Sequence, residues 1–114
     1  MMNDDRRGSA RLVESLPFKI GGEGFDVASE TLNMSKSGLL CRVRKEIPLM
    51  TKIEVLLLLP GAEGKANEIR AKGVIVRSEK NEDGTFKVAI FFTEMSKNCQ
   101  ERFDAYLQKR MKRQ

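Results

Sequence analysis

Residues 72–92 read KGVIVRSEKNEDGTFKVAIFF and contain the clearest structural signal in the chain. At their centre, Asp83-Gly84 is a strong signal for a tight hairpin, because such turns need residues that accept a positive φ. The residues before and after the turn alternate in the way expected of two paired strands. One face of the first strand carries Arg70, Lys72, Val74 and Val76, and one face of the second carries Val88, Ile90 and Phe92.

The same pattern of short apolar segments and turn residues recurs on the N-terminal side of this hairpin. LPFKI is followed by GGEGF, in which three glycines in four residues predict another hairpin turn. FDVASETLNMS then predicts a strand that runs into a loop. In GLLCRVRKE, the residues Leu39, Cys41 and Val43 alternate with Arg42 and Arg44, which is the alternation of a strand.

Two connections and one further strand complete this half of the chain. IPLMTK contains a proline and predicts a connection, whereas KIEVLLLLP is a β-rich run that ends at a proline. GAEGKANE, with two glycines, predicts a loop before the strand at residues 68–79. The pattern thus predicts about six short strands joined by hairpin-like turns, and therefore a small antiparallel barrel or sandwich.

The C-terminal residues differ in character from the rest of the chain. In SKNCQERFDAYLQKRMKRQ the apolar residues fall at 99, 103, 106, 107 and 111, which is helical spacing, and Ser96 is a suitable N-cap. The basic residues near the end complement the helix dipole. We therefore expect an arm at residues 1–12, which we interpret as flexible, a β-domain at 13–95 and a helix at 96–114.

The net charge and the absence of histidine limit the functions that the chain can have. The chain has 114 residues, a net charge of +5 and a pI of about 9.4, which suits an anionic partner, although solubility alone can explain a charge of this size. It has no histidine, the commonest general base at neutral pH, and no visible nucleophile and base pair, so we expect no catalytic residues and no enzyme.

The cysteine pattern predicts neither a metal site nor a cofactor. Cys41 and Cys99 are far apart and form no CxxC pair, so a zinc site is not expected, and free buried thiols are favoured over a disulfide. No run of apolar residues approaches the length of a membrane span, and the N-terminus lacks the apolar core of a signal peptide. These features predict a cytoplasmic protein.

Two polar clusters are the candidates for a binding site. The first, Arg6-Arg7-Gly8-Ser9-Ala10-Arg11, carries guanidinium groups that can bind phosphate or stack on a base. The second, Asn33 to Gly38, combines short hydrogen-bonding side chains with a glycine that permits a positive φ or a close approach. Taken singly, the first can be a solvated basic arm and the second a plain loop that enters a strand.

Together the clusters resemble the PilZ family, whose motifs are RxxxR followed by [D/N]xSxxG. Arg7 and Arg11 match the first motif, and Asn33, Ser35 and Gly38 match the second. Arg6-Arg7 is similar to the tandem arginine of many members, whereas Leu39 stands where a second glycine often follows the motif. The resemblance covers nearly the whole chain and implies a six-stranded antiparallel β-barrel with a C-terminal helix, in agreement with the strand pattern.

The resemblance also implies a ligand, cyclic di-GMP, a bacterial second messenger. Arg7 and Arg11 would contact phosphate and the Hoogsteen edge of guanine, and Arg6 would stack on a base or hold a second phosphate. Asn33 and Ser35 would bond a guanine edge or the sugar-phosphate, and Gly38 would let the backbone approach closely. Arg77 is a further candidate, by position only, for a contact with guanine.

The expected function is that of a single-domain adaptor. We predict that ligand orders the N-terminal arm and that an unidentified protein partner reads this change. The tandem arginine allows one or two ligands per chain. Motility, pilus assembly, exopolysaccharide synthesis, which underlies biofilm, and virulence are all outputs of the family.

Two alternatives stay open. A small basic barrel can bind nucleic acid, and KRMKR supplies a cationic patch, but the chain has one Tyr, six Phe and no Trp for stacking on single strands. A degenerate PilZ domain could act through protein contact only, although its motif residues are intact. Oligonucleotide binding that is unaffected by cyclic di-GMP would favour the first alternative.

Overall fold

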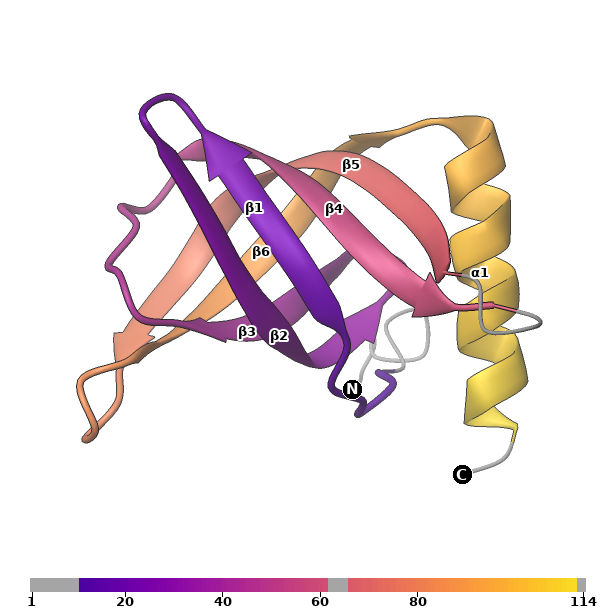
Figure 1. The fold of residues 1–114 in the computed structure, drawn as a ribbon, viewed down its shortest axis with the longest axis horizontal. Coiled ribbons are helices and arrows are strands. Elements are labelled where there is room, and N and C mark those ends of the chain that lie inside the picture. Colours follow the sequence, from indigo (N-terminus) through magenta and orange to yellow (C-terminus); the bar gives the residue numbers. More distant parts are fainter. Residues whose placement is uncertain (1–10, 62–65, 113–114) are drawn as a thin grey trace, which may run out of the picture.

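The computed structural model describes residues 11–61 and 66–112. In chain order these form β1 (Pro17–Gly22), β2 (Phe25–Ser35), β3 (Gly38–Val43), β4 (Lys52–Pro60), β5 (Ala66–Lys80), β6 (Phe86–Met95) and α1 (Lys97–Met111). The strands form a closed barrel in the order β1-β2-β3-β6-β5-β4, with β4 paired back to β1, and every pairing is antiparallel. The predicted six-stranded barrel with a C-terminal helix is confirmed, and Figure 1 shows α1 beside one end of it.

The tight turns lie where the sequence predicts them. Gly24 and Gly84 have φ of 84° and 89°, the left-handed region that costs glycine little, and they close the β1–β2 and β5–β6 hairpins. In the second turn, the backbone N–H of Asn81 donates to the carbonyl of Thr85 over 2.7 Å. Short turns therefore fix the register of both hairpins.

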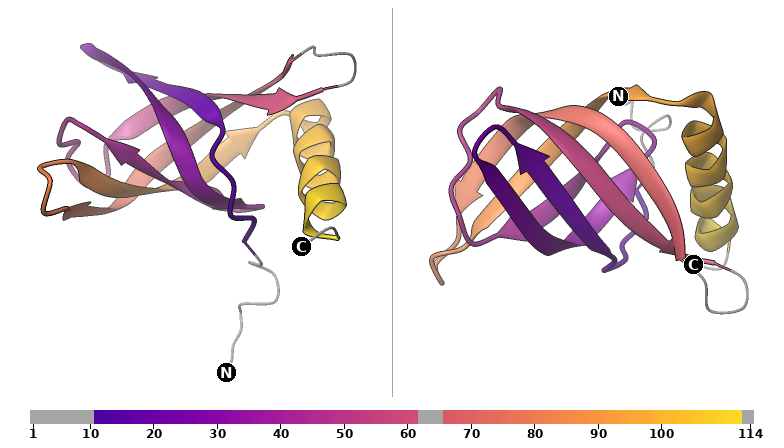
Figure 2. Two further views of the ribbon diagram at one scale, coloured as in Figure 1. Left: turned by 60° about the horizontal axis from the view of Figure 1, so that its bottom comes forward. Right: turned by 45° about the horizontal axis from the view of Figure 1, so that its top comes forward.

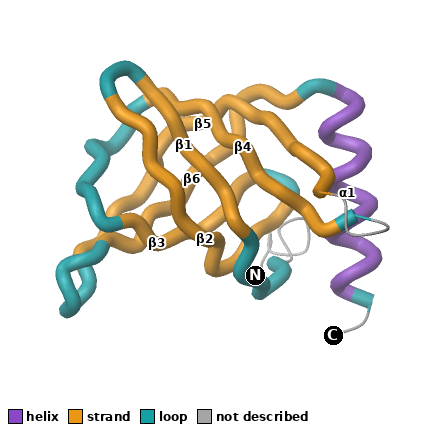
Figure 3. The backbone as a smooth tube through the Cα atoms, in the orientation of Figure 1, coloured by secondary structure: helices purple, strands orange, loops and turns teal. Residues whose placement is uncertain are grey.

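One long connection contrasts with these turns. Residues 44–51 link β3 to β4, and Figure 3 shows this loop running along the flank of the barrel. Ile47 is buried and anchors the loop, whereas Leu49 and Met50 are exposed. The predicted connection at IPLMTK is thus confirmed.

The core fills the barrel from alternate positions of every strand, as a period of two requires. Cys41 lies inside the barrel and Cys99 lies on the buried face of α1, and both are free thiols. Burial raises the pKa of the Cys41 thiol to about 12. The largest fully buried side chains are Phe103, Leu12, Ile20, Met34, Leu39, Leu57, Leu59, Ile69, Ile75, Leu107, Val43 and Val88.

Helix α1 is capped and packed as its sequence predicts. The Ser96 hydroxyl accepts a hydrogen bond from the backbone N–H of Cys99 over 3.1 Å, and the buried residues Cys99, Phe103 and Leu107 recur at helical spacing. The ring of Phe103 meets that of Phe92 edge-on, with centroids 5.9 Å apart. Figure 2 shows the helix against the same barrel end in two further views.

The far end of α1 is tied to the N-terminal segment. The Tyr106 hydroxyl donates to a Glu14 carboxylate oxygen over 2.8 Å, and the Arg110 guanidinium donates to the other oxygen. Burial, followed by the hydrogen bond to Glu14, raises the pKa of Tyr106 to about 12. These bonds hold residues separated by more than ninety positions in one network, since Glu14 and Tyr106 are 92 apart.

Two expectations need correction. FDVASETLNMS does not run into a loop, because β2 continues through all of these residues to Ser35. The GAEGKANE segment is not loop throughout, because β5 begins at Ala66 and pairs there with Pro60. In both cases ladder hydrogen bonds extend a strand through residues that have weak strand propensity of their own.

Candidate functional site

Residues 11–16 lie along β2 and carry the first candidate residue. Leu12 forms an isolated bridge with Met34, in which each backbone N–H donates to the other's carbonyl, over 2.8 and 3.0 Å. The Leu12 side chain is fully buried, whereas Arg11 is exposed. The Arg11 guanidinium donates to the side-chain oxygen of Asn33 over 2.7 Å. The structure therefore brings together one residue of each predicted motif.

A bulge in β2 turns Asn33 to the outside of the barrel. Thr31 pairs with Cys41 and Asn33 with the adjacent Leu40, so Leu32 is an extra residue in β2. Without it, Asn33 would share the inward face of Thr31, because positions i and i+2 of a strand point the same way. The extra residue therefore makes the Asn33 amide available to a ligand outside the barrel.

The inward Thr31 fixes the segment that precedes β1. Its hydroxyl donates to the carbonyl of Glu14 over 2.7 Å and accepts the backbone N–H of Leu16 over 2.9 Å. These bonds and the Leu12 bridge hold both ends of residues 12–16 against β2. Arg11 therefore directly precedes a segment whose backbone is hydrogen-bonded to β2.

Ser35 is the last residue of β2, beside the turn that leads to β3, and it is fully buried. Its oxygen lies 3.3 Å from the backbone nitrogen of Ser37, 3.3 Å from the hydroxyl of Ser37 and 3.5 Å from the carbonyl oxygen of Gly38. Asn33 and Ser35 thus differ in what they offer. The amide of Asn33 faces the outside, and the hydroxyl of Ser35 shapes the turn beside it.

Gly38 is required by the packing of β3 against β6. A Cβ at this position would lie 2.0 Å from the carbonyl oxygen of Ile90, far inside van der Waals contact. The φ of Gly38 is not in the left-handed region, so the need for glycine comes from this close approach of two backbones. The motif glycine therefore has a structural role that does not depend on a ligand.

Arg77 lies on the same outer face as Asn33, three strands away. The registers place Asn33 opposite Leu40, Leu40 opposite Ala89 and Ala89 opposite Arg77. Strands are spaced about 4.8 Å apart, so the path along the curved sheet from Asn33 to Arg77 is about 14 Å. A bulge between Ile75 and Arg77 adds Val76 to β5, and both Val76 and Arg77 are exposed.

Between these two polar residues, the outer face has a small apolar surface. Leu40 and Ala89 are partly exposed and form the middle of the row from Asn33 to Arg77. Neither residue was among the predicted site residues, although the inward alternation of Leu39, Cys41 and Val43 already implies an outward Leu40. Arg6 and Arg7 lie outside the described residues, as does most of the predicted arm.

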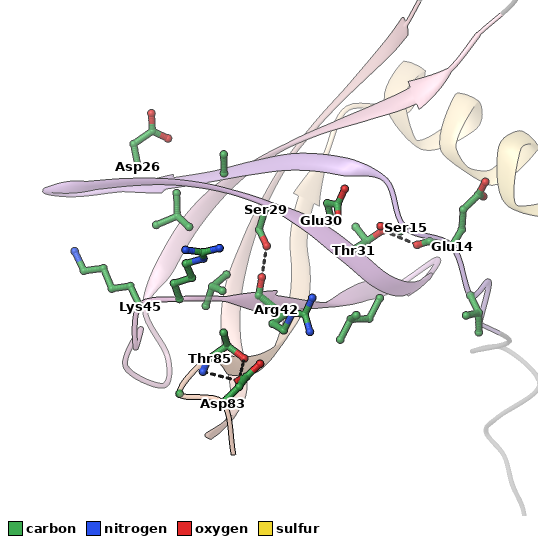
Figure 4. A pocket seen from close by; sticks show the side chains of 17 residues that line it. Glu14, Ser15, Asp26, Ser29, Glu30, Thr31, Arg42, Lys45, Asp83 and Thr85 are labelled. Atoms are coloured by element: carbon green, nitrogen blue, oxygen red, sulfur yellow. Dashed lines mark hydrogen bonds between the residues drawn. The ribbon is translucent and has the colours of Figure 1, made fainter. Parts of the chain in front are cut away.

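A separate cleft lies elsewhere on the barrel. It has a volume of about 1150 Å³ and is lined by residues 13–15, by residues 26–32 of β2 and by the segments at Arg42–Lys45 and Asp83–Thr85 (Figure 4). Carboxylates and cations both line it, and hydrogen bonds from Thr85 lower the pKa of Asp83. Of the predicted ligand residues that the structure describes, none lines this cleft. The carboxylates beside its cations disfavour an anion there.

The described residues lack two further features. No group of three or more acidic or cysteine side chains there is arranged to hold a metal ion. No helix among them has the length and apolar character needed to cross a membrane.

Comparison with known proteins places the chain in a family. Its fold matches the solved structure of the Bacillus subtilis inhibitor of motility (MotI/DgrA) with a TM-score of 0.85 at 15% sequence identity, over 100% of this chain and 54% of that one. The chain thus spans about half the length of that protein. A search of curated proteins found no match. The family model described as "PilZ domain" matches residues 5–109, and the chain therefore belongs to the PilZ domain family.

Proposed function

We propose that the chain binds cyclic di-GMP on the outer face of β2, β3 and β6 and acts as an adaptor for a partner protein. The observation that carries this proposal is the hydrogen bond between Arg11 and Asn33, which joins the two family motifs at the outside of the barrel. Membership of the PilZ family supports the choice of ligand.

The chemistry of the site suits a guanine dinucleotide. Arginine forms paired hydrogen bonds with the O6 and N7 atoms of guanine and with phosphate oxygens. Asn33 orients the Arg11 guanidinium by accepting one of its N–H groups, which leaves the other donors free for the ligand. Leu40 and Ala89 offer an apolar surface to the flat face of a base.

The predicted arm supplies the remaining cations. In the proposal, Arg6 and Arg7 close over a ligand held at Arg11 and Asn33, and Arg77 contacts its far end. Ser35 and Gly38 act by fixing the turn that presents Asn33. Binding of the ligand neutralises the repulsion among the arginines and orders the arm, which a partner protein then reads.

Calorimetry with cyclic di-GMP tests the binding site. We expect binding to weaken by about 1–3 kcal/mol in each of the variants Arg7→Ala, Arg11→Ala and Asn33→Ala. Each variant removes a hydrogen bond to a phosphate or a guanine edge of the ligand. Arg70→Ala is the matched control, since Arg70 is an exposed arginine whose described contact is with Glu68. Equal affinity of all four variants and the parent chain would reject the proposed site.

Amide hydrogen exchange tests the proposed ordering of the arm. Residues 5–12 should exchange more slowly in the presence of cyclic di-GMP, and unchanged rates at saturating ligand would reject arm ordering while leaving ligand binding intact. Motility is the first process to examine for the adaptor function, because MotI/DgrA is named as an inhibitor of motility.

A further inference from the structure

An exposed apolar patch lies on the barrel beside the proposed ligand site. Of the large hydrophobic side chains that the described chain exposes, Leu49, Met50, Val76 and Phe91 are 59%, 68%, 48% and 49% accessible, and Val13 is the remaining one. We name these four residues the apolar patch. Exposed hydrophobic residues that cluster mark interaction surfaces more often than residues that are scattered singly.

Backbone pairing places Met50, Val76 and Phe91 near one another, and Leu49 directly precedes Met50 in the chain. The backbone N–H of Met50 donates to the carbonyl of Ile75 over 2.7 Å, so Met50 lies next to Val76. Phe91 is paired with Val74, two positions from Val76 on the same outer face. From Met50 to Phe91 the patch crosses two strand spacings, which is about 10 Å and close to the diameter of an α-helix.

Met50 is held in place at a conformational cost. Its φ of 67° is the only positive value among the non-glycine residues described. Such a conformation costs of order 1 kcal/mol and persists where neighbouring bonds impose it. Here the bond to Ile75 imposes it, together with the Thr51 hydroxyl, which donates to the Pro48 carbonyl over 2.6 Å. The loop is therefore fixed with two apolar side chains in solvent.

The surroundings of the patch define what it can bind. Lys52 is paired with Val74, and Arg77 follows Val76, so the ladder places a cation on either side of the apolar residues. β4, β5 and β6 are each paired along both edges, so no strand of a partner can be added at the patch. An occupant must therefore bind through its side chains.

We propose that the apolar patch docks an amphipathic helix of the partner protein, with an apolar stripe bordered by Asp or Glu. This proposal rests on the proposed adaptor function, because it names the partner's chemistry. A second copy of the chain is disfavoured, because a two-fold contact at the patch brings Lys52 and Arg77 of one copy toward the same cations of the other. Arg77 lies at both the patch and the ligand face, so the two sites are contiguous.

The test uses a designed helical peptide and the isotope-labelled full chain, with and without cyclic di-GMP. The peptide carries leucines at helical spacing between two rows of glutamates. We expect amide shifts at residues 49–52, 74–77 and 89–92, and at least tenfold weaker binding when lysines replace the glutamates. Binding should weaken at least fivefold in Met50→Gly and in Phe91→Ser, and stay unchanged in Val13→Ser, which removes an exposed apolar side chain elsewhere.

Several outcomes would overturn this proposal. They are the absence of peptide shifts, shifts outside the patch, or equal affinity for the lysine peptide. If amide shifts at the patch depend on protein concentration in the absence of peptide, the occupant of the patch is a second copy of the chain. If the chain binds anionic phospholipid vesicles and Phe91→Ser abolishes this binding, the occupant is a lipid surface. Because the peptide is also tested without cyclic di-GMP, binding of the peptide can be judged even if the chain does not bind the nucleotide.

Discussion

Gly38 shows how a motif residue can be required by the fold itself. Family resemblance predicts a glycine that lets a ligand approach the backbone, and the structure shows one whose missing Cβ lets β3 approach β6. The two roles are separable, because a substitution that disturbs the fold lowers stability whether or not ligand is present.

We predict that Gly38→Ala lowers the free energy of unfolding by more than about 2 kcal/mol, because the new methyl group would lie 2.0 Å from the Ile90 carbonyl oxygen and force two paired strands apart. Urea denaturation without ligand measures this. Gly21→Ala is the control, since its Cβ would meet nothing closer than 3.7 Å. A loss below about 0.5 kcal/mol in Gly38→Ala would leave only a ligand-related reason for this glycine.

Asn33 shows what the sequence cannot reveal at a single position. The motif correctly indicates Asn33 as a polar residue near Arg11, and the structure joins them. A strict alternation from Thr31 would have placed Asn33 inside the barrel, and only the ladder register reveals the extra Leu32. Bulges depend on the partner strand, so their position is not encoded in the local pattern of apolar residues.

The N-terminal segment contains the boundary between the arm and the barrel. Arg11 and Leu12 fall within the predicted arm, yet Leu12 is fully buried and bridged to Met34. Val13, the next residue, is 72% exposed. These neighbours therefore make a matched pair for measuring how firmly the segment is attached.

Leu12→Ala is expected to cost about 3 kcal/mol of unfolding free energy, because it leaves a cavity in a fully packed region. Val13→Ala should change stability by less than about 0.5 kcal/mol, as exposed positions do. Thermal and chemical denaturation of both variants measure the difference. Similar losses in the two variants would contradict the asymmetric burial.

Most secondary elements could be predicted from local patterns. Alternation around Asp83-Gly84 and the helical spacing after Ser96 each indicate one element with its turn or cap, and both are confirmed. The ends of β2 and β5 were predicted wrongly, because pairing with β3 and β4 extends them. The apolar patch could not be predicted from the sequence either, because valine and phenylalanine in a strand, such as Val76 and Phe91, are normally expected in the core.

At the scale of the whole molecule, the described residues Cys41 and Tyr106 bind their protons more tightly than usual. Burial raises the pKa of Cys41 from its ordinary 9.0 to about 12, and burial with the Glu14 bond raises that of Tyr106 from 10.0 to about 12. The unfolded chain loses these protons at lower pH than the folded chain does. The stability that they contribute is therefore complete below pH 9 and is lost as pH rises toward 12.

We predict that the free energy of unfolding falls between pH 9 and pH 12, with a contribution of the order of 4 kcal/mol from Cys41, since its pKa rises from 9.0 to about 12. Denaturation at a series of pH values under reducing conditions measures the slope. Cys41→Ala should flatten the profile, and Tyr106→Phe should flatten it further in the double variant. A profile in Cys41→Ala as steep as that of the parent would show that other groups are responsible.

The bridge between Leu12 and Met34 also sets a length limit. Arg7 precedes Leu12 by five residues, and an extended chain spans at most about 3.6 Å per residue, so its backbone must stay within about 18 Å of that anchor. Tethering of this kind gives a side chain an effective concentration in the millimolar range at a nearby surface. The number of residues between Arg7 and the Leu12 anchor therefore sets the effective concentration of the Arg7 side chain at the barrel surface. Inserting glycine and serine residues between Arg7 and Arg11 would lower this concentration without altering a contact of the barrel.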